Sequence, residues 1–470
     1  MSVCLVVMTV WIAAVVVAVM WDSVEFAIIF SGSGRQSVVS ALIVCGIVLC
    51  VGYCLWLVSP CVVGAAGPGH DHVGPLSKDE EAGEEPQWDK LWVLLNPHGG
   101  AGKAVDRYKR IAEPLLAPLS PETVSTEFAG YAGCFVANLV HDLPTDELKN
   151  VCVAVCGGDG TVHEMVNGLL GALDEEAAAA GGAATTASRA SSSSSSTKKS
   201  KSKRSRANTT EVVDTPPRTG ATCGITLAVL PGGSGNSVAM DMFSRDRHPY
   251  TDGAGEVRTA DALMTRAART LLARSTVLVD VNKVTFRIPT RDGSVSDTHV
   301  VYSMNMVGFG ATADVGVLAE QFRWLGTSRY DLVGMYILLK KQLVHISISD
   351  TSSGATFEGN AVTGFVNLTC HFGKGMRATP GALLTDGLFD VCLLTETSRP
   401  SAVAGFLQLG RGAHKNLDTL QFYQESRATF TVTDPTTGST AGVMNIDGEL
   451  YKFSGPVTIE SVPRAIKLVI

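Results

Sequence analysis

The chain has 470 residues, of which 45% are hydrophobic and 18% are charged, and it contains 48 glycines. At roughly 100 to 200 residues per domain, this length predicts two or three folded units, and the apolar content excludes a fibrous or wholly disordered protein. A net charge of −7 excludes a globally basic nucleic-acid-binding protein, so we expect no nucleic-acid partner.

Two apolar runs stand at the start of the chain, at residues 3–20 and 38–58. Each approaches or reaches the ~20 apolar residues that an α-helix needs to cross a bilayer. The residues between them include Asp22, Glu25 and Arg35, which are too polar for hydrocarbon. We therefore predict a hairpin of two transmembrane helices within residues 1–60; the alternative is a pair of buried apolar helices. Residues 61–90 are rich in Gly, Pro and acidic side chains, which is typical of a linker.

Three continuous apolar runs follow: LWVLLNP from Leu91, NVCVAVCGGDG from Asn150 and GITLAVLPGGSG from Gly224. Each is followed by a loop and a helix-like segment, so the pattern predicts buried parallel strands of an α/β domain over residues 91–275. Cys152 and Cys156 stand at even positions of the second run, so that both would face the same side of a strand. We interpret them as small core residues rather than as a metal pair.

Residues 174–220 interrupt this domain with a stretch of Ala and Gly, a run of serines and a basic string from Lys198 to Arg206. Such a composition cannot build a core, so we predict a disordered insertion. The basic string is interpreted as a solvated charge run, a contact with anionic membranes or a nuclear-import signal.

Residues 276–470 consist of short segments in which apolar and polar residues alternate, such as VHISISD from Val344 and GLFDVCLL from Gly387. Gly, Asn and Asp separate the segments. This pattern predicts a second domain, a mostly antiparallel β-sandwich.

The first glycine-rich loop is NPHGGAGK, from Asn96 to Lys103. It follows a predicted strand and precedes a helical segment, where backbone N–H groups can bind phosphate oxygens. It is not a Walker A loop, because Pro97 replaces the first Gly of that motif and Ala104 replaces its Ser or Thr. The alternative is a glycine turn without function.

The second loop is GGDGTVHE, from Gly157 to Glu164. Its glycines allow the backbone to approach a nucleotide, and Asp159 between them is suited to accept a proton from a substrate hydroxyl or to hold Mg²⁺. Thr161 also suits a helix cap.

The third loop is PGGSGN, from Pro231 to Asn236. All three loops follow strands, and the carboxyl ends of parallel strands meet at one edge of a sheet. The sequence therefore predicts one nucleotide-binding site built from three loops.

Three later segments add to these loops: GFGATADVGVLAEQFRWLGTSRY from Gly308, TPGALLTDGLFDVCLL from Thr379 and NIDGEL from Asn445. With them, residues 91–470 apart from the insertion resemble the diacylglycerol kinase catalytic superfamily, and within it the sphingosine kinase and ceramide kinase branch. The resemblance implies an α/β nucleotide-binding domain followed by a β-sandwich lipid-binding domain. It also implies an ATP-dependent lipid kinase that uses Mg²⁺.

The resemblance assigns roles to individual residues. Asp159 is the implied catalytic base, Asn96 and Glu164 lie on the adenosine side, and Asp447 and Glu449 hold Mg²⁺. Lys103, Arg323 and Arg329 contact phosphates. The full set of implied nucleotide-binding residues is Asn96, Gly99, Gly100, Lys103, Gly157, Gly158, Gly160, Thr161, Glu164, Gly233, Ser234, Gly235, Asn236, Arg323, Arg329, Gly448 and Glu449.

The implied lipid headgroup pocket contains Asp314, Met306 and Gly316. Sphingosine kinases typically carry a second acid where this chain has Gly316, and a hydroxyl residue where it has Met306. An amine without that carboxylate loses a charge-assisted hydrogen bond of about 1.5 to 3 kcal/mol. A sphingoid-type lipid is therefore the first expectation, and ceramide or diacylglycerol is the alternative.

Two other functions remain as hypotheses. An NAD kinase shares the GGDGT motif, but the apolar spans and the late DGE disfavour it. A pseudokinase that only binds lipid is disfavoured by the presence of Lys103, Asp159 and Glu449. Since ATP is cytosolic, we expect a two-pass membrane protein whose catalytic domain faces the cytosol.

Overall fold

The computed structural model describes residues 88–190, 223–244, 259–290, 295–325, 328–373, 376–409 and 412–470. Every described residue belongs to the unit formed by residues 77–470. The predicted membrane hairpin at residues 1–60 and the linker up to residue 87 lie outside the described residues. Among the helices that are described, none combines the length and the apolar character needed to cross a bilayer.

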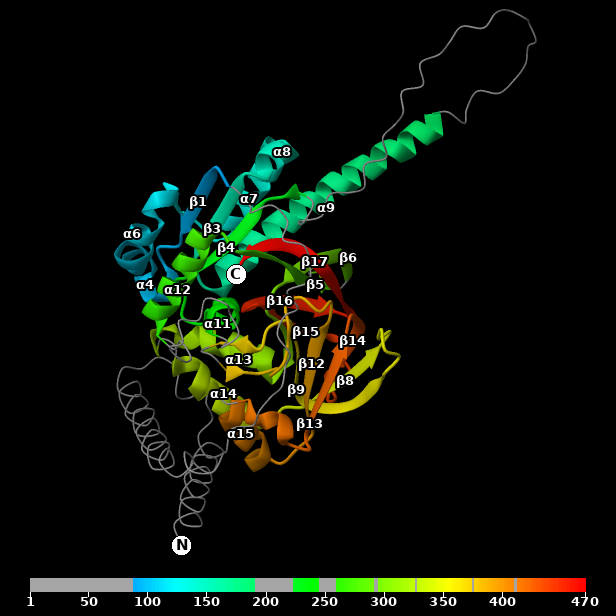
Figure 1. Cartoon of the computed structure of the whole chain (residues 1–470). Helices are drawn as coiled ribbons and strands as arrows, with labels where there is room; N and C mark the ends of the chain where they lie inside the picture. Colours follow the sequence, from blue (N-terminus) through cyan, green and yellow to red (C-terminus); the bar gives the residue numbers. More distant parts are fainter. Residues whose placement is uncertain are drawn as a thin grey trace, which may run out of the picture. The chain divides into compact units, whose positions relative to one another are not determined.

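The first half of the described chain is an α/β domain, as the sequence predicts (Figure 1). Its strands are β1 (Lys90–Leu95), β2 (Glu122–Ser125), β3 (Val151–Gly157) and β4 (Thr226–Pro231). They pair in parallel in the order β2-β1-β3-β4. The helices are α4 (Gly99–Gly102), α5 (Ala104–Arg107), η1 (Tyr108–Ala112), α6 (Glu113–Leu116), η2 (Ala117–Leu119), α7 (Tyr131–Asp142), α8 (Thr145–Leu148), α9 (Asp159–Ala190), α11 (Ser237–Ser244) and α12 (Ala260–Ala273).

The centre of this sheet is apolar on both faces. Every residue of β3 and of β4 is buried, as expected of parallel strands covered by helices on both sides. Cys152 and Cys156 are fully buried in β3, which agrees with their interpretation as core residues. Burial raises the pKa of the Cys156 thiol to about 12, so this thiol stays protonated.

Helix α9 begins at Asp159, within the second loop, and packs closely on α7. A Cβ atom at Gly168 would lie 2.2 Å from the carbonyl oxygen of Gly133, so this crossing requires glycine. The helix also continues to Ala190, into the segment predicted to be disordered, as Figure 1 shows. That prediction was wrong for residues 174–190, because Ala and Glu favour a helix even where no core can form. Residues 191–222 lie outside the described residues.

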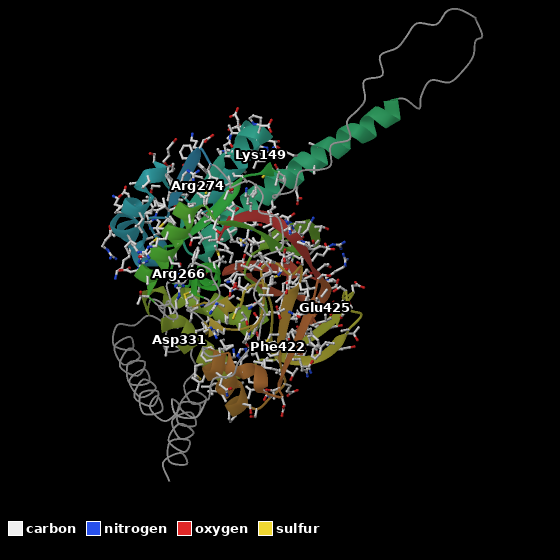
Figure 2. The ribbon with its side chains drawn as sticks, in the orientation of Figure 1. Lys149, Arg266, Arg274, Asp331, Phe422 and Glu425 are labelled. Atoms are coloured by element: carbon white, nitrogen blue, oxygen red, sulfur yellow. The ribbon has the colours of Figure 1, made fainter. Side chains whose placement is uncertain are left out.

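Helix α12 closes the domain on the side of the third loop. Thr259 caps its first turn through a hydrogen bond from the Ala262 N–H, 3.2 Å from Thr259 Oγ1. The helix ends at Arg274 (Figure 2), whose φ of 55° is left-handed. The Arg274 guanidinium lies 5.4 Å from the centre of the Trp88 ring. A cation over an aromatic face is attracted to it, so this contact holds the start and the end of the domain together.

The second half of the described chain is rich in β-structure. Its strands are β5 (Thr276–Pro289), β6 (Val295–Ser303), β7 (Met306–Gly310), β8 (Val344–Ser349), β9 (Phe357–Asn367), β10 (His371–Phe372), β11 (Met376–Arg377), β12 (Phe389–Thr395), β13 (Leu420–Glu425), β14 (Arg427–Thr433), β15 (Ala441–Ile446), β16 (Glu449–Ser454) and β17 (Val457–Val469). Its helices are α13 (Ala311–Ala319), η3 (Glu320–Leu325), α14 (Ser328–Lys340), α15 (Arg399–Gln408) and η5 (Ala413–Asn416). The strand pairs within this half are antiparallel, which confirms a sandwich-like second region.

The last strand joins the two halves. Lys467 and Leu468 of β17 pair in parallel with Thr226 and Leu227 of β4, while β5 and β14 pair antiparallel with the same strand. Figure 1 shows β17 in red running from the sandwich to β4. The C-terminal residues therefore extend the first sheet, although they follow the second domain in sequence. The predicted boundary at residue 276 stays a prediction.

Candidate active site

The three glycine-rich loops contact one another at the carboxyl edge of the parallel sheet. The N–H groups of Gly232 and Gly233 donate to the carbonyl oxygen of Gly157, at 2.8 and 2.9 Å. A Cβ atom at Gly100 would lie 2.4 Å from the carbonyl oxygen of Gly232, and Gly100 has a φ of +56°. The glycines are thus required for the loops to approach each other as well as for any ligand to approach them.

Asn96 links the first loop to the second. Its Nδ2 donates to Thr161 Oγ1 at 3.1 Å, and its Oδ1 accepts the His98 N–H at 3.0 Å. Lys103, the last residue of the first loop, is by contrast exposed to solvent. Asn96 therefore holds the loops in place, and Lys103 is an exposed cation at the end of the first loop.

The third loop is braced internally. The side chain of Asn236 accepts the Gly233 N–H at 2.8 Å and donates to the Gly233 carbonyl oxygen at 2.9 Å, with a φ of 53° at Asn236. Ser234 at the loop tip is exposed. Asn236 therefore shapes the loop, while Ser234 and the neighbouring backbone are its outward-facing parts.

Asp159, the predicted base, lies where the second and third loops meet. Its Oδ2 accepts the Ser237 hydroxyl at 3.0 Å, and its Oδ1 accepts the Val238 N–H at a longer 3.3 Å. A Cβ atom at Gly235 would lie 2.8 Å from Asp159 Oδ2, so the carboxylate rests directly against the third loop. Burial raises the pKa of Asp159, hydrogen bonds from Ser237 and Val238 oppose the rise, and the charge of Asp447 adds to it.

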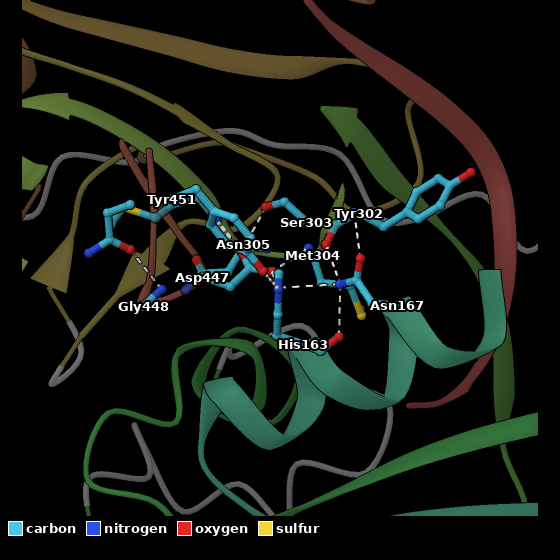
Figure 3. A network of polar contacts seen from close by, with 11 residues as sticks. His163, Asn167, Tyr302, Ser303, Met304, Asn305, Asp447, Gly448 and Tyr451 are labelled. Atoms are coloured by element: carbon cyan, nitrogen blue, oxygen red, sulfur yellow. Dashed lines mark hydrogen bonds and ion pairs between the residues drawn. The ribbon is translucent and has the colours of Figure 1, made fainter. Parts of the chain in front are cut away.

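Asp447 of the DGE segment is buried in the turn between β15 and β16 (Figure 3). It has more hydrogen-bond donors than Asp159. The donors to its two carboxylate oxygens, at 2.7 to 3.0 Å, are Ser303 Oγ, Met304 N, Asn305 N, Met306 N and His163 Nδ1. Although burial alone would raise the pKa of Asp447, these bonds, led by that of His163, lower it. With both oxygens occupied by protein donors, the geometry disfavours Asp447 as a magnesium ligand, and that role stays an untested prediction.

His163 joins the two halves of the protein, a role that the sequence did not reveal. It lies on α9, one turn after Asp159, and is 5% exposed. Its Nδ1 lies 3.0 Å from Asp447 Oδ2 and its Nε2 lies 2.9 Å from the hydroxyl of Tyr451, as Figure 3 shows. The only signal in the sequence is the position of His163 within GGDGTVHE, because its partners follow almost 300 residues later in the chain.

The contacts of His163 with Asp447 and Tyr451 set the position of Glu449, which lies between these two residues in the sequence. A Cβ atom at Gly160 would lie 3.0 Å from Glu449 Oε1, so the DGE turn places this carboxylate beside the second loop. Gly448 has a φ of +99°, and its N–H donates to Asn445 Oδ1 at 2.8 Å. Since the Glu449 side chain is exposed, it remains accessible to a cation.

Glu164 is the last residue of the second loop and lies on α9. Burial raises its pKa, and bonds from the backbone N–H groups of Gly130 and Ala132, at the start of α7, oppose the rise. The nearby charge of Glu449 raises the pKa further. Glu164 therefore binds a helix N-terminus in this structure, and its predicted place on the adenosine side stays untested.

Of the two predicted arginines, Arg329 has a described side chain. Arg329 is largely buried on α14, where its Nη2 lies 3.5 Å from Glu320 Oε1 and donates to the Tyr330 hydroxyl at 2.7 Å. Both contacts involve Nη2, whereas the Nε–H of Arg329 is buried and has no hydrogen-bond partner. The side chain of Arg323 lies outside the described residues.

The predicted headgroup residues lie next to the DGE turn. Met306 is buried, and its backbone exchanges two hydrogen bonds with Asp447. A Cβ atom at Gly316 would lie 2.9 Å from Leu450 Cδ2 and 3.0 Å from Asn445 Nδ2. Asp314, on the same helix α13, has a pKa raised by burial and partly lowered again by Lys340.

Comparisons with known proteins agree with this architecture. The diacylglycerol kinase catalytic domain model matches residues 90–265, and the YegS C-terminal NAD kinase beta sandwich-like domain model matches residues 305–470. A putative diacylglycerol kinase from Bacillus anthracis has the same fold, with a TM-score of 0.52 at 17% identity over 81% of this chain and 97% of that one.

Among named relatives, sphingosine kinase 1 of Rattus norvegicus is 25% identical over 77% of this chain and 86% of its own length. Ceramide kinase of Mus musculus is 24% identical over 55% of this chain and 37% of its own length. The chain therefore belongs to the diacylglycerol kinase superfamily, in the sphingosine kinase and ceramide kinase branch. It is an ATP-dependent lipid kinase.

Proposed function

We propose that this lipid kinase transfers the γ-phosphoryl group of ATP to a primary hydroxyl of a sphingoid-type lipid. The observation that carries the proposal is Asp159, an acid with a raised pKa at the junction of two glycine-rich loops. Phosphoryl transfer needs a group that accepts the proton of the attacking hydroxyl, and a raised pKa improves a carboxylate as that acceptor. The relatives that match most of the chain are sphingosine kinases, which supports the lipid class.

The residues present fit ATP and a magnesium ion. The loops offer backbone N–H groups without side chains in the way, and Lys103 is the exposed cation beside them. Glu449 is the exposed carboxylate at the same edge and would hold Mg²⁺, which neutralises phosphate charge. In this proposal Asp447 positions Glu449, and Asp159 takes the lipid proton.

Gly316 supports the alternative acceptors, ceramide or diacylglycerol. The space beside it is occupied by the ends of Asn445 and Leu450, and the residue brings no charge to this region. A sphingoid amine would have Asp314 as the acid of this helix, and the burial that raises the pKa of Asp314 weakens it as an anionic partner. A neutral headgroup requires no anion here.

We also propose that residues 1–60 anchor the enzyme in a membrane as two helices, with the catalytic domain in the cytosol. The support is the apolar character of residues 3–20 and 38–58. An insoluble acceptor is met in the plane of the bilayer, so an anchor serves this reaction. Fractionation of the full chain and of a chain starting at residue 77 tests this proposal: the full chain should pellet with membranes, and equal distribution of both would refute it.

Transfer of labelled γ-phosphate to a panel of sphingosine, ceramide, diacylglycerol and NAD tests the activity. We expect a lipid product, with sphingosine as the first acceptor. Transfer to NAD alone would identify an NAD kinase, and transfer to nothing would identify a pseudokinase; both results would refute the proposal.

The variant Gly316→Asp sharpens the panel. Its Cβ atom would meet Leu450 Cδ2 and Asn445 Nδ2, so both side chains have to shift slightly, and its carboxylate would add an anion near the predicted headgroup. We expect a gain for sphingosine relative to ceramide. Gly171→Asp is the matched control, because a Cβ atom there meets nothing within 4 Å and lies on α9 away from this region.

A further inference from the structure

An aromatic side chain in the turn before α7 is exposed to solvent. Phe128 is 57% exposed, the most of any large hydrophobic side chain in the described part of the chain. The other exposed members of this group are aliphatic: Leu272, Val300, Val317, Leu407 and Leu450. Single exposed apolar residues are common on protein surfaces, so the position of Phe128 decides whether its exposure has a function. The reaction described above gives it no role.

The backbone places Phe128 at the carboxyl edge of the parallel sheet. The N–H of Thr126, the residue after β2, donates to the carbonyl oxygen of Leu95, the last residue of β1, at 2.8 Å. The chain then turns: the Tyr131 N–H donates to the carbonyl oxygen of Phe128 at 3.2 Å, and Gly130 has a φ of +91°. The first glycine-rich loop begins directly after β1, so this turn lies beside it.

The same turn contacts the second loop. Glu164, the last residue of that loop, accepts hydrogen bonds from the backbone N–H groups of Gly130 and Ala132. A Cβ atom at Gly133 would lie 2.8 Å from the carbonyl oxygen of Glu164, so the start of α7 rests directly on α9. The turn that carries Phe128 therefore borders both the first and the second loop.

A row of aromatic rings supports Phe128 and connects it to the sheet. The ring centres of Phe128 and Tyr131 lie 5.3 Å apart. Tyr131 stacks on Phe135 of α7 at 6.5 Å, and Phe135 meets Trp92 of β1 edge to face at 5.3 Å. A ring that is already fixed by its neighbours loses little freedom when a ligand binds, which favours affinity. Phe128 is thus an exposed ring on a rigid support.

We propose that Phe128, supported by Tyr131, is the surface on which the adenine base of ATP stacks. This inference rests on the proposed phosphoryl transfer from ATP at the glycine-rich loops. The γ-phosphoryl group has to reach Asp159, which contacts the third loop, and the base is at the opposite end of the nucleotide. With the phosphates on the loops, the base extends past the first and second loops to the turn before α7. Stacking suits this ligand, because every nucleobase has a π-face.

Calorimetric titration of the full-length protein with ATP and with inorganic triphosphate tests the proposal. Both ligands carry the phosphate chain, and only ATP carries a base. Phe128→Ala should weaken ATP binding about 10-fold and leave triphosphate binding unchanged. In lipid phosphorylation, the same variant should raise the KM for ATP and change kcat little. Leu407→Ala is the matched control, because Leu407 is 51% exposed on α15, and it should bind both ligands as the wild type does.

Phe128→Trp gives a second measurement that does not depend on activity. Its indole should retain ATP binding, and ATP, but not triphosphate, should quench its fluorescence beyond any change in the wild type. Leu407→Trp should show no added quenching. Wild-type ATP affinity in Phe128→Ala, or no added quenching in Phe128→Trp, would overturn the stacking surface and leave the kinase function intact. A wild type that binds no ATP would overturn both proposals.

Discussion

Two acids on opposite sides of the domain interface, the partly buried Asp159 and the buried Asp447, have pKa values shifted in opposite directions. Asp159 is held by Ser237 and Val238, and burial raises its pKa. Asp447 accepts five hydrogen bonds, and its pKa is lowered in spite of burial. Burial raises the pKa of both acids. The hydrogen bonds to Asp447 and the charge of His163 reverse that rise, whereas at Asp159 the charge of Asp447 adds to it. Asp159, which has few hydrogen-bond donors, is suited to take a proton. Asp447, whose oxygens are saturated with donors, is suited to stabilise the fold.

Asp159→Asn should have the largest effect on activity. It removes the proton acceptor while it keeps the shape of the side chain, so the rate of lipid phosphorylation should fall by about 10²–10⁴-fold. Steady-state kinetics with the best acceptor of the panel measure this effect. The thermal midpoint should change little, and an active Asp159→Asn enzyme would remove the base from the account.

Asp447→Asn should lower the stability of the protein more than Asp159→Asn does. Five donors lose a charged acceptor in a buried site, and the free energy of unfolding should fall by about 3 kcal/mol. Urea unfolding of a chain of residues 77–470, followed by fluorescence, measures this change. Asp142→Asn, at an exposed position, is the control and should be neutral; an equally neutral Asp447→Asn would contradict the division of roles.

Tyr451→Phe should have a smaller effect on the same interface. The hydroxyl of Tyr451 lies 2.9 Å from His163 Nε2, and loss of one such bond costs about 0.5 to 1.5 kcal/mol. The same unfolding experiment measures it. Tyr131→Phe is the matched control, because Tyr131 packs its ring on Phe128 and Phe135 at the surface of α7. Equal losses in both variants would mean that the bond to His163 contributes nothing.

The sequence predicted one side of this comparison better than the other. Asp159 stands between glycines that follow an apolar run, so its place at the edge of a sheet was predictable from local pattern. The partners of Asp447 lie on β6, β7 and α9, and the bond from His163 spans 284 residues. No local pattern encodes a contact of that range. For the same reason, the parallel pairing of β17 with β4 was visible only in the folded chain.

The prediction of disorder over residues 174–220 failed in part for a different reason. The composition excludes a core, but an alanine-rich segment needs no core for a helix to be its preferred local conformation. The α/β domain and the sandwich were predicted correctly because their strands are long apolar or alternating runs.

The pH dependence of kcat/KM for the wild type and for Ser237→Ala tests the division of roles most directly. The deprotonated form of Asp159 is the base, so activity should be lost as pH falls through its pKa, at a higher pH than an ordinary carboxylate would give. Removal of the Ser237 hydroxyl takes away a donor that lowers this pKa, so the acid limb should move to still higher pH. Ser401→Ala, on α15, is the control and should leave the limb in place. An acid limb that stays unchanged in Ser237→Ala would contradict the account.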